Sequence, residues 1–306
     1  MSLAAGGITL TSMTVSLVQR FSSLDPFENL AREEVWLDTL EAGTSALLLY
    51  VNRPCVVLGR HQNPLREVRL DEAARRGVPV VRRASGGGTV WHDEGNLNWS
   101  VVVPKTGYDR GEVSATVARA LAPLGFSLEV GEKGDLLLGE KKVSGAAYLF
   151  RRDRVLHHGT LLCRARLDDL RGILGPTGTL VEWVGVASRP APVTNLNVDP
   201  ERAIEALARG LGAGTVDDGR GDADFEARVQ HRARELSGDP WRWDQTPPFT
   251  WEGEFREGFG RFSVREGLVE RWEGKNPGDT NGNMIKILGK RFFSPGLFEY
   301  VPREVP

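Results

Sequence analysis

The chain has 306 residues, 40% hydrophobic and 26% charged, with a formal net charge of −2. This composition is that of a globular protein with a substantial core, and it argues against a basic nucleic-acid-binding surface and against an acidic disordered tail. The two cysteines, Cys55 and Cys163, form no Cys-x-x-Cys pair, which argues against a zinc finger or a disulfide framework. No apolar run reaches the roughly 18 residues that a membrane span needs, so no membrane association is expected.

Residues 1–12 are rich in Ala, Gly, Ser and Thr, and we expect them to be a leader outside the fold. Positions 1–19 contain no Arg or Lys, which argues against a secretory signal and against a mitochondrial presequence. A reducing compartment also fits the cysteine usage. We therefore expect a cytoplasmic protein, with the mitochondrion as the alternative.

The first expected element is a helix that starts at Asp25-Pro26, an N-cap followed by a proline, and ends near Gly43. Asp199-Pro200 repeats this signal and opens a later helix. The other expected helices span 70–76, 113–124 and 224–236. The expected strands span 45–51, 55–60, 78–83, 96–103, 134–138, 141–148, 155–163, 248–256, 259–265 and 268–273.

Short polar turns join the three strands between 134 and 163, which predicts an antiparallel meander. Together with the helices, this pattern predicts an α+β fold with a mixed, mostly antiparallel sheet. The segment Ser237-Gly238-Asp239-Pro240 is typical of a domain boundary. We expect a larger domain at 13–236 and a smaller one at 237–306.

The most informative segment is residues 82–98, RRASGGGTVWHDEGNLN. Three glycines after a strand allow a sharp bend whose N–H groups can converge on one anion. Arg82 and Arg83 add guanidinium groups that match carboxylate or phosphate. The segment favours a cradle for a nucleotide phosphate or an acyl phosphate, the alternative being a glycine-rich bend with a solvated charged rim. It matches neither the Walker pattern nor the dinucleotide-binding fingerprint.

A second segment, GDLLLGEKKVSGAAYLF at 134–150, begins with Asp135 near the start of an apolar strand. Strand alternation places Lys141 and Lys142 on opposite faces, so at most one of them faces a cleft. An inward lysine could bridge an acyl carbonyl and a phosphate oxygen as both develop charge. The alternative is a pair of solvated lysines at a sheet edge.

A third segment, LHHGTLL at 156–162, places His157 and His158 on opposite faces of a strand. One of them could line a pocket while the other is structural. Because ligands from adjacent strand positions rarely converge, no protein-ligated metal site is expected.

These three segments, in this order, resemble the lipoate–protein ligase and lipoyltransferase family of the biotin/lipoate ligase superfamily. The resemblance covers nearly the whole chain from about Leu24. The matching segments are NLAREE at 29–34, VVLGRHQNPLREV at 56–68, RRASGGGTVWHDEGN at 82–96, KKVSGAA at 141–147, HHGTLL at 157–162, VTNL at 193–196 and WRWDQTPPF at 241–249.

The resemblance implies the biotin/lipoate ligase catalytic fold, a mixed and mostly antiparallel sheet flanked by helices, with a small, here reduced, α+β accessory domain at the C-terminus. It implies that lipoate reacts with ATP and Mg²⁺ to form lipoyl-AMP, and that a lysine of an apo lipoyl domain then takes the lipoyl group. The expected carriers are the E2 subunit of a 2-oxoacid dehydrogenase and the glycine cleavage H protein. A monomer is expected.

The resemblance also implies roles for particular residues. Lys142, not Lys141, is the matching lysine and the expected catalytic residue. Apart from the resemblance, Asp135 is a candidate base, because the carrier lysine must lose a proton before it attacks. An apolar wall of the acyl pocket is expected from Val56–Leu58. The implied nucleotide contacts are Arg83, Gly86, Gly87, Gly88, Thr89, Val90, Trp91, Asp135 and Lys142. The implied lipoate contacts are Ser85, His92, Lys142, His158 and Gly159.

One departure leaves alternatives open. Gly134 stands where bacterial ligases usually carry asparagine, and the animal lipoyltransferases, which are thought to use preformed lipoyl-nucleotide, also lack that asparagine. A lipoyltransferase is therefore an alternative, as is a non-enzymatic protein that binds lipoyl domains. An octanoyltransferase would need a nucleophilic cysteine, and residues 164–190 contain none. A biotin ligase would need a Gly-Arg-Gly-Arg-type loop, which this chain lacks.

Overall fold

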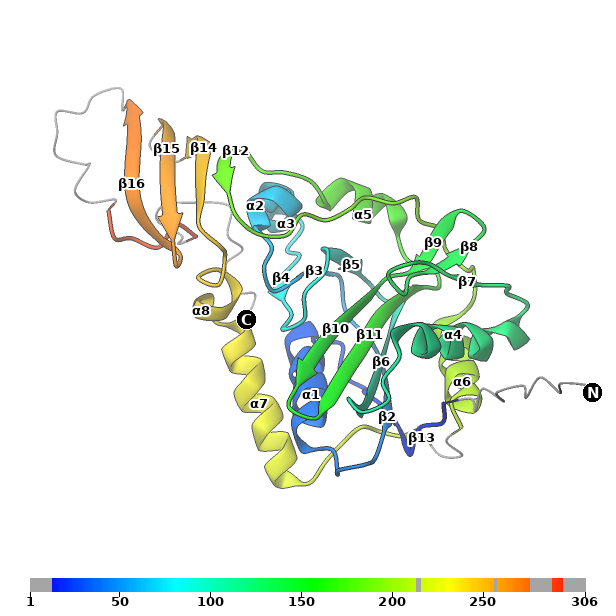
Figure 1. Cartoon of the computed structure of the whole chain (residues 1–306). Coiled ribbons are helices and arrows are strands. Elements are labelled where there is room, and N and C mark those ends of the chain that lie inside the picture. Colours follow the sequence, from blue (N-terminus) through cyan, green and yellow to red (C-terminus); the bar gives the residue numbers. More distant parts are fainter. Residues whose placement is uncertain (1–12, 213–215, 256–257, 276–287, 294–306) are drawn as a thin grey trace, which may run out of the picture.

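The computed structural model describes residues 13–212, 216–255, 258–275 and 288–293. The leader expected at residues 1–12 lies outside the described residues. A large region surrounds a mixed sheet, and a smaller sheet stands at one end of the molecule (Figure 1). Mostly antiparallel strands flanked by helices confirm the predicted α+β class.

The main sheet has the strand order β10-β11-β6-β2-β1-β13. Neighbouring strands from β10 to β2 run antiparallel, whereas β1 runs parallel to both β2 and β13. Its strands are β1 (Leu17–Arg20), β2 (Ala46–Val51), β6 (Asn96–Pro104), β10 (Ala146–Arg151), β11 (Arg154–Leu162) and β13 (Val216–Asp217).

The helices begin largely where the sequence predicts. The side chain of Asp25 accepts hydrogen bonds from the N–H groups of Phe27 (2.8 Å) and Glu28 (3.1 Å), and Asp199 caps the later Asp-Pro helix in the same way. The helices are α1 (Pro26–Thr39), α2 (Pro64–Glu67), α3 (Leu70–Arg75), α4 (Arg110–Leu121), the 3-10 turn η1 (Ala122–Leu124), α5 (Leu167–Ile173), α6 (Pro200–Gly210), α7 (Ala223–Ser237) and α8 (Asp239–Arg242). No described helix is long and apolar enough to cross a membrane.

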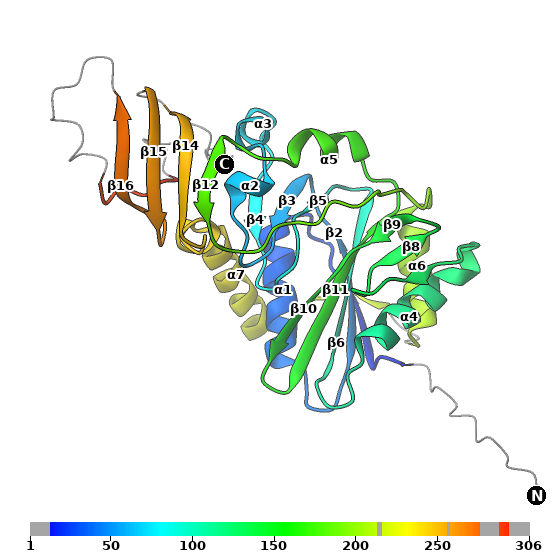
Figure 2. The ribbon, with the colours of Figure 1, turned by 45° about the horizontal axis from the view of Figure 1, so that its top comes forward.

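Both faces of the main sheet are covered, which explains why β2 is apolar along its whole length. Leu47 and Leu49 face a core that they share with α4 and α6. Leu48 and Tyr50 face the other side, where α1 packs. Figure 2 shows α1 and α7 on one side of the sheet and α4 and α6 on the other.

Two small three-stranded sheets flank the main sheet and carry the sequence motifs. One has the order β4-β3-β5 and leads into and out of the triglycine bend, and the other has the order β7-β8-β9. Their strands are β3 (Cys55–Leu58), β4 (Val80–Arg82), β5 (Val90–His92), β7 (Glu129–Val130), β8 (Leu136–Leu138) and β9 (Lys141–Ser144).

The strand expected at 141–148 is two strands, which corrects the prediction of one continuous meander. β9 pairs with β8 in the small sheet, whereas β10 begins at Ala146 and pairs with β11 in the main sheet. The chain changes sheets at Gly145, whose carbonyl accepts from the N–H of Thr160 (3.0 Å). A Cβ at Gly145 would lie 3.0 Å from Lys142 Nζ, so this position admits only glycine without moving the lysine.

The C-terminal strands follow the prediction, but their sheet recruits an earlier strand. β14 (Phe249–Phe255), β15 (Gly258–Arg265) and β16 (Leu268–Lys275) form an antiparallel sheet, and β12 (Thr179–Trp183) pairs with β14 as its fourth strand. This sheet is therefore not built from residues 237–306 alone. The division into domains at residue 237 stays a prediction.

Candidate active site

A cavity of about 620 Å³ lies between the triglycine bend, the start of β10 and strand β9. This volume is in the range of small-molecule sites. Its walls include Gly87 and Gly88 from the bend, Lys142 from β9 and His158 from β11. The two motifs that the sequence singles out therefore share one cavity, although more than 50 residues separate them.

Most of the residues expected in the site line this cavity, together with Val57 from the expected apolar wall. Those that do are Arg83, Gly87, Gly88, Thr89, Val90, His92, Asp135, Lys142, His158 and Gly159. Gly86 is not among the lining residues. Ser85 and Trp91 are also absent from the lining, and their side chains bond within the protein: the hydroxyl of Ser85 lies 2.7 Å from His158 Nε2, and Trp91 Nε1 donates to Asp93 Oδ2 (2.9 Å). Their contacts with ligands stay predictions.

Arg83 holds the triglycine bend from inside the protein. Its guanidinium donates to the carbonyls of Gly86 (2.6 Å) and Gly88 (2.8 Å). Since C=O and N–H point in opposite directions across a trans peptide, the N–H groups of Gly87 and Thr89 face away from Arg83. Burial lowers the pKa of Arg83 to about 10, so the group stays charged at pH 7 beneath the bend.

Arg82 does not reach the cavity, which corrects the idea that both arginines offer forks to a ligand. It is fully buried and donates to the carbonyls of Arg242 (2.9 Å), Arg60 (3.0 Å) and Gln62 (2.8 Å) and to the hydroxyl of Thr246 (2.9 Å). Its role is to join β4 to the segment around α8.

Lys142 is the inward lysine of the pair, as predicted, and Lys141 is exposed. Its Nζ lies 3.0 Å from Asp135 Oδ1, and both side chains are about a quarter exposed (28% and 26%). The backbone of Lys142 is fixed on the other side, because its N–H donates to Pro192 O (2.9 Å) and its carbonyl accepts from Thr194 N–H (3.0 Å).

His158 belongs to a buried polar chain. Its Nδ1 lies 2.9 Å from Glu33 Oε2, and Glu33 also accepts from the hydroxyls of Tyr50 (2.9 Å) and Ser100. Glu33 and Tyr50 line the cavity, and sequence reasoning assigned them no role. The NLAREE motif contains Glu33 and was the available signal. His157 points to the opposite face, against Tyr148, and does not line the cavity.

Residues 184–192, which we call the strap, were missed as part of the site. The strap runs from the end of β12 along the cavity to Pro192, whose carbonyl accepts from the N–H of Lys142 in β9. The hydroxyl of Ser188 accepts from Thr89 N–H (2.8 Å) and Gln62 Nε2 (3.0 Å), and Ser188 N–H donates to Glu67 Oε1 (3.1 Å). The strap is thus fastened to the outer face of the triglycine bend.

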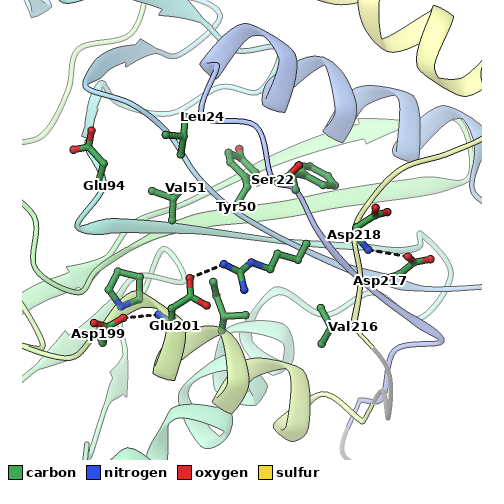
Figure 3. Close-up of a pocket in the computed structure, with 14 residues that line it drawn as sticks. Ser22, Leu24, Tyr50, Val51, Glu94, Asp199, Glu201, Val216, Asp217 and Asp218 are labelled. Atoms are coloured by element: carbon green, nitrogen blue, oxygen red, sulfur yellow. Dashed lines mark hydrogen bonds and ion pairs between the residues drawn. The ribbon is translucent and has the colours of Figure 1, made fainter.

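A second cavity, of about 720 Å³, lies beside β1, β2 and the start of α6 (Figure 3). Glu94 is its one residue from the motif at 82–96, and it shares only Tyr50 with the first cavity. Arg20 bonds Glu201 there, and Asp199 caps α6. We therefore place the chemistry in the first cavity.

Neither cysteine can serve as an exposed nucleophile in the first cavity. Cys55 and Cys163 are fully buried and neither lines the cavity. Burial raises the pKa of both thiols, that of Cys163 to about 12. Among the described residues there is also no group of three His, Cys, Asp or Glu side chains that could hold a metal ion by itself.

The Lys142 ammonium group and the triglycine bend beside one cavity fit an enzyme that activates or transfers an acyl group. Residues 25–210 match the lipoyl protein ligase A/B catalytic domain. The chain belongs to this family, the lipoate–protein ligases, and is an enzyme of the ligase type.

Three similar proteins illustrate the relationship. The chain is 31% identical to the lipoate-protein ligase A of Psychrobacter cryohalolentis over 252 residues, 77% of this chain and 74% of the relative. A solved structure of lipoate-protein ligase A bound with ATP is 25% identical, with a TM-score of 0.58, over 76% of this chain and 98% of the other. A Thermoplasma acidophilum protein with bound lipoic acid is 25% identical, with a TM-score of 0.61, over 75% of this chain and 99% of the other.

Proposed function

We propose that the protein forms lipoyl-AMP from lipoate and ATP in the first cavity and then transfers the lipoyl group to a lysine of an apo lipoyl domain. The observation that carries this proposal is the single cavity that joins the triglycine bend to the Lys142 ammonium group. Two similar solved structures support it, since one contains ATP and the other contains lipoic acid.

The buried end of the cavity suits the acyl chain. Leu30, Tyr50 and Val57 line it and are nearly or fully buried. A chain that enters here brings its carboxylate out toward Lys142 and the bend. The same burial excludes water, which an acyl-phosphate anhydride requires because it hydrolyses readily.

In the first step a lipoate carboxylate oxygen attacks the α-phosphorus of ATP, a new O–P bond forms, and the bond to pyrophosphate breaks. Negative charge grows on the phosphate oxygens while the carboxylate becomes an anhydride. The Lys142 ammonium group and the Gly87 N–H are fixed donors on the two sides of this centre. Fixed donors in a water-poor site stabilise such charge without reorganising.

Mg²⁺ fits as a partner of the nucleotide. It is usually held by one or two carboxylates together with substrate phosphates and water. Asp135 and Glu132 are carboxylates that line the cavity, and Asp135 lies beside Lys142. These two residues would hold the ion, which would neutralise charge on the phosphate oxygens.

In the second step the carrier lysine attacks the acyl carbonyl, an amide bond forms, and AMP leaves. A lysine of ordinary pKa, about 10.4, is almost entirely protonated at pH 7, so the site must take up a proton. Asp135 is our candidate for this role. Its carboxylate is 3.0 Å from Lys142 Nζ. It becomes available once the ion has left with pyrophosphate and the AMP phosphate competes for that ammonium group.

Use of preformed lipoyl-nucleotide is the second candidate, and Gly134 favours it. This residue has a φ of +81°, and a Cβ there would collide with the hydroxyl of Tyr148. The asparagine expected of an activating enzyme at this position therefore does not fit here. The buried cysteines argue against an octanoyltransferase, and an intact Lys142 argues against a non-enzymatic carrier-binding protein.

ATP–pyrophosphate exchange with free lipoate, followed by transfer to an apo lipoyl domain, tests the proposal. We expect both exchange and transfer. Transfer from chemically prepared lipoyl-AMP without exchange would replace the proposal by the lipoyltransferase candidate. Neither activity would contradict both.

We propose the E2 subunit of a 2-oxoacid dehydrogenase and the glycine cleavage H protein as carriers. We also propose that the enzyme acts as a monomer in the cytoplasm. Transfer to both purified apo carriers, and a sedimentation measurement of the mass in solution, test these points.

A further inference from the structure

The buried end of the cavity contains a histidine with one unpaired ring nitrogen. The ring of His92 lines the cavity and is only 4% exposed. Its Nδ1 lies 2.9 Å from Asn52 Nδ2. Its Nε2 is buried and has no hydrogen-bond partner among the residues that the structure describes.

The orientation of the neighbouring amides follows from the backbone. Asn29 Nδ2 lies 2.8 Å from the carbonyl oxygen of Ser23 and 3.4 Å from that of Val51. Carbonyl oxygens only accept, so the Asn29 atom that faces them must be the nitrogen. The same nitrogen donates to Asn52 Oδ1 (2.8 Å), which leaves the Asn52 nitrogen facing His92.

This chain of donors fixes the proton of His92. An amide nitrogen only donates, so Nδ1 of His92 must accept and carries no proton. Burial, with smaller effects from Arg83 and His158, lowers the pKa of His92 to about 3, so the ring is neutral at pH 7. A neutral ring without a proton on Nδ1 carries it on Nε2.

His158, the other histidine of the cavity, has the opposite arrangement. Its Nδ1 donates to the Glu33 carboxylate, and its Nε2 lies 2.7 Å from the Ser85 hydroxyl. Both nitrogens of His158 are therefore satisfied within the protein. The Nε2–H of His92 is not, and a buried donor without a partner is destabilising until a ligand supplies an acceptor.

We propose that the Nε2–H of His92, held in this tautomer by Asn52, selects acyl chains that carry a hydrogen-bond acceptor at their far end. The inference rests on the proposed function, which places the chain in this part of the cavity. The dithiolane sulfurs of lipoate are weak acceptors at the far end of the chain. Octanoate has a chain of the same length and ends in a methyl group, so it leaves the donor unpaired. Asn52 is a positioning residue, because it acts through His92.

The test compares lipoate with octanoate in transfer by the full-length enzyme. We expect kcat/KM for lipoate to exceed that for octanoate by about tenfold, or about 1.4 kcal/mol. The double variant Asn52→Leu/His92→Phe replaces both partners by apolar groups of similar shape, which limits the loss of stability. It should bring the ratio close to one, and Asn52→Leu alone should give an intermediate ratio. His157→Gln, outside the cavity, is the matched control and should keep the wild-type ratio.

A structural role alone would lower turnover of both acids equally and leave the ratio unchanged, and that result would overturn the inference. The ¹⁵N resonances of His92 give a second readout. We expect a protonated Nε2 and an unprotonated Nδ1 in the wild type, and the reverse would also overturn the inference. If the wild type transfers neither acid, the proposed function fails, and the ratio of the dissociation constants of the two acids then decides the inference.

Discussion

The ammonium nitrogen of Lys142 lies 3.0 Å from Asp135 Oδ1, inside the cavity that also holds the triglycine bend. The pair is partly exposed, so its contribution to the free energy of unfolding is below about 1 kcal/mol. Its importance is chemical, because it keeps a cation in place before any phosphate arrives.

We expect Lys142→Ala to lower lipoyl transfer by at least about a hundredfold, since a fixed charge at the reacting centre contributes about 3 kcal/mol or more. The melting temperature should change by only a few degrees at most, because the pair adds little stability. Lys141→Ala, on the exposed face of the same strand, should keep wild-type transfer. Wild-type turnover by Lys142→Ala would remove the role assigned to this residue.

Gly134 cannot accept a side chain in this structure. Its φ is +81°, and a Cβ would lie 2.9 Å from Ser114 Oγ and closer still to the Tyr148 hydroxyl, which bonds the carbonyl of Lys133. We expect Gly134→Ala and Gly134→Asn to destabilise the fold by about 2–4 kcal/mol, from the left-handed backbone and overpacking. Urea unfolding measures this.

The control is Gly131→Ala in the same loop, because a Cβ there meets nothing closer than 3.7 Å. It should change the free energy of unfolding by less than about 1 kcal/mol. If Gly134→Asn were as stable as the wild type, the loop geometry described above would be wrong.

Arg82 should be one of the residues most sensitive to substitution. Burial lowers its pKa to about 9, so it remains charged at pH 7, and five carbonyl or hydroxyl oxygens accept hydrogen bonds from it. We expect Arg82→Met to lower the free energy of unfolding by about 3–5 kcal/mol. Arg82→Lys should keep only part of this stability, since an ammonium group cannot reproduce the planar set of donors of a guanidinium group. Arg75→Met, on the exposed side of α3, is the control in the same chemical denaturation experiment.

The free energy of unfolding should fall as the pH is lowered below 6.5. Burial lowers the pKa values of His92 and His157 to about 3, so the unfolded chain binds more protons than the folded one between pH 6.5 and 3. Each histidine then removes about 1.4 kcal/mol per pH unit well below pH 6.5, or about 2.7 kcal/mol for both. Urea unfolding between pH 6.5 and 5 measures the slope. His157→Phe should reduce this slope by about half, and an unchanged slope would show that His157 is not held neutral.

Strand alternation predicted that one lysine of Lys141 and Lys142 and one histidine of His157 and His158 would face the cavity, and the family resemblance selected Lys142 and His158. The break at Gly145 was missed, since a single glycine can also lie within one strand and only the change of sheet reveals two strands. Ser188 and Glu67 were missed for another reason. Their contacts join segments more than 100 residues apart, and a single polar residue in a loop gives no periodic signal.

Strand β12 comes before residue 237 in the sequence, but it belongs to the sheet of β14, β15 and β16. This arrangement has a consequence for any attempt to divide the enzyme. Trp251 and the rest of β14 cover one edge of Thr179–Trp183, and Trp251 Nε1 also donates to Thr177 O (2.9 Å). A chain cut after Ser237 would keep β12 and lose its hydrogen-bonding neighbour. Bare strand edges with apolar side chains promote aggregation. A two-chain version of this architecture would therefore have to be assembled during folding, with the second chain present from the start.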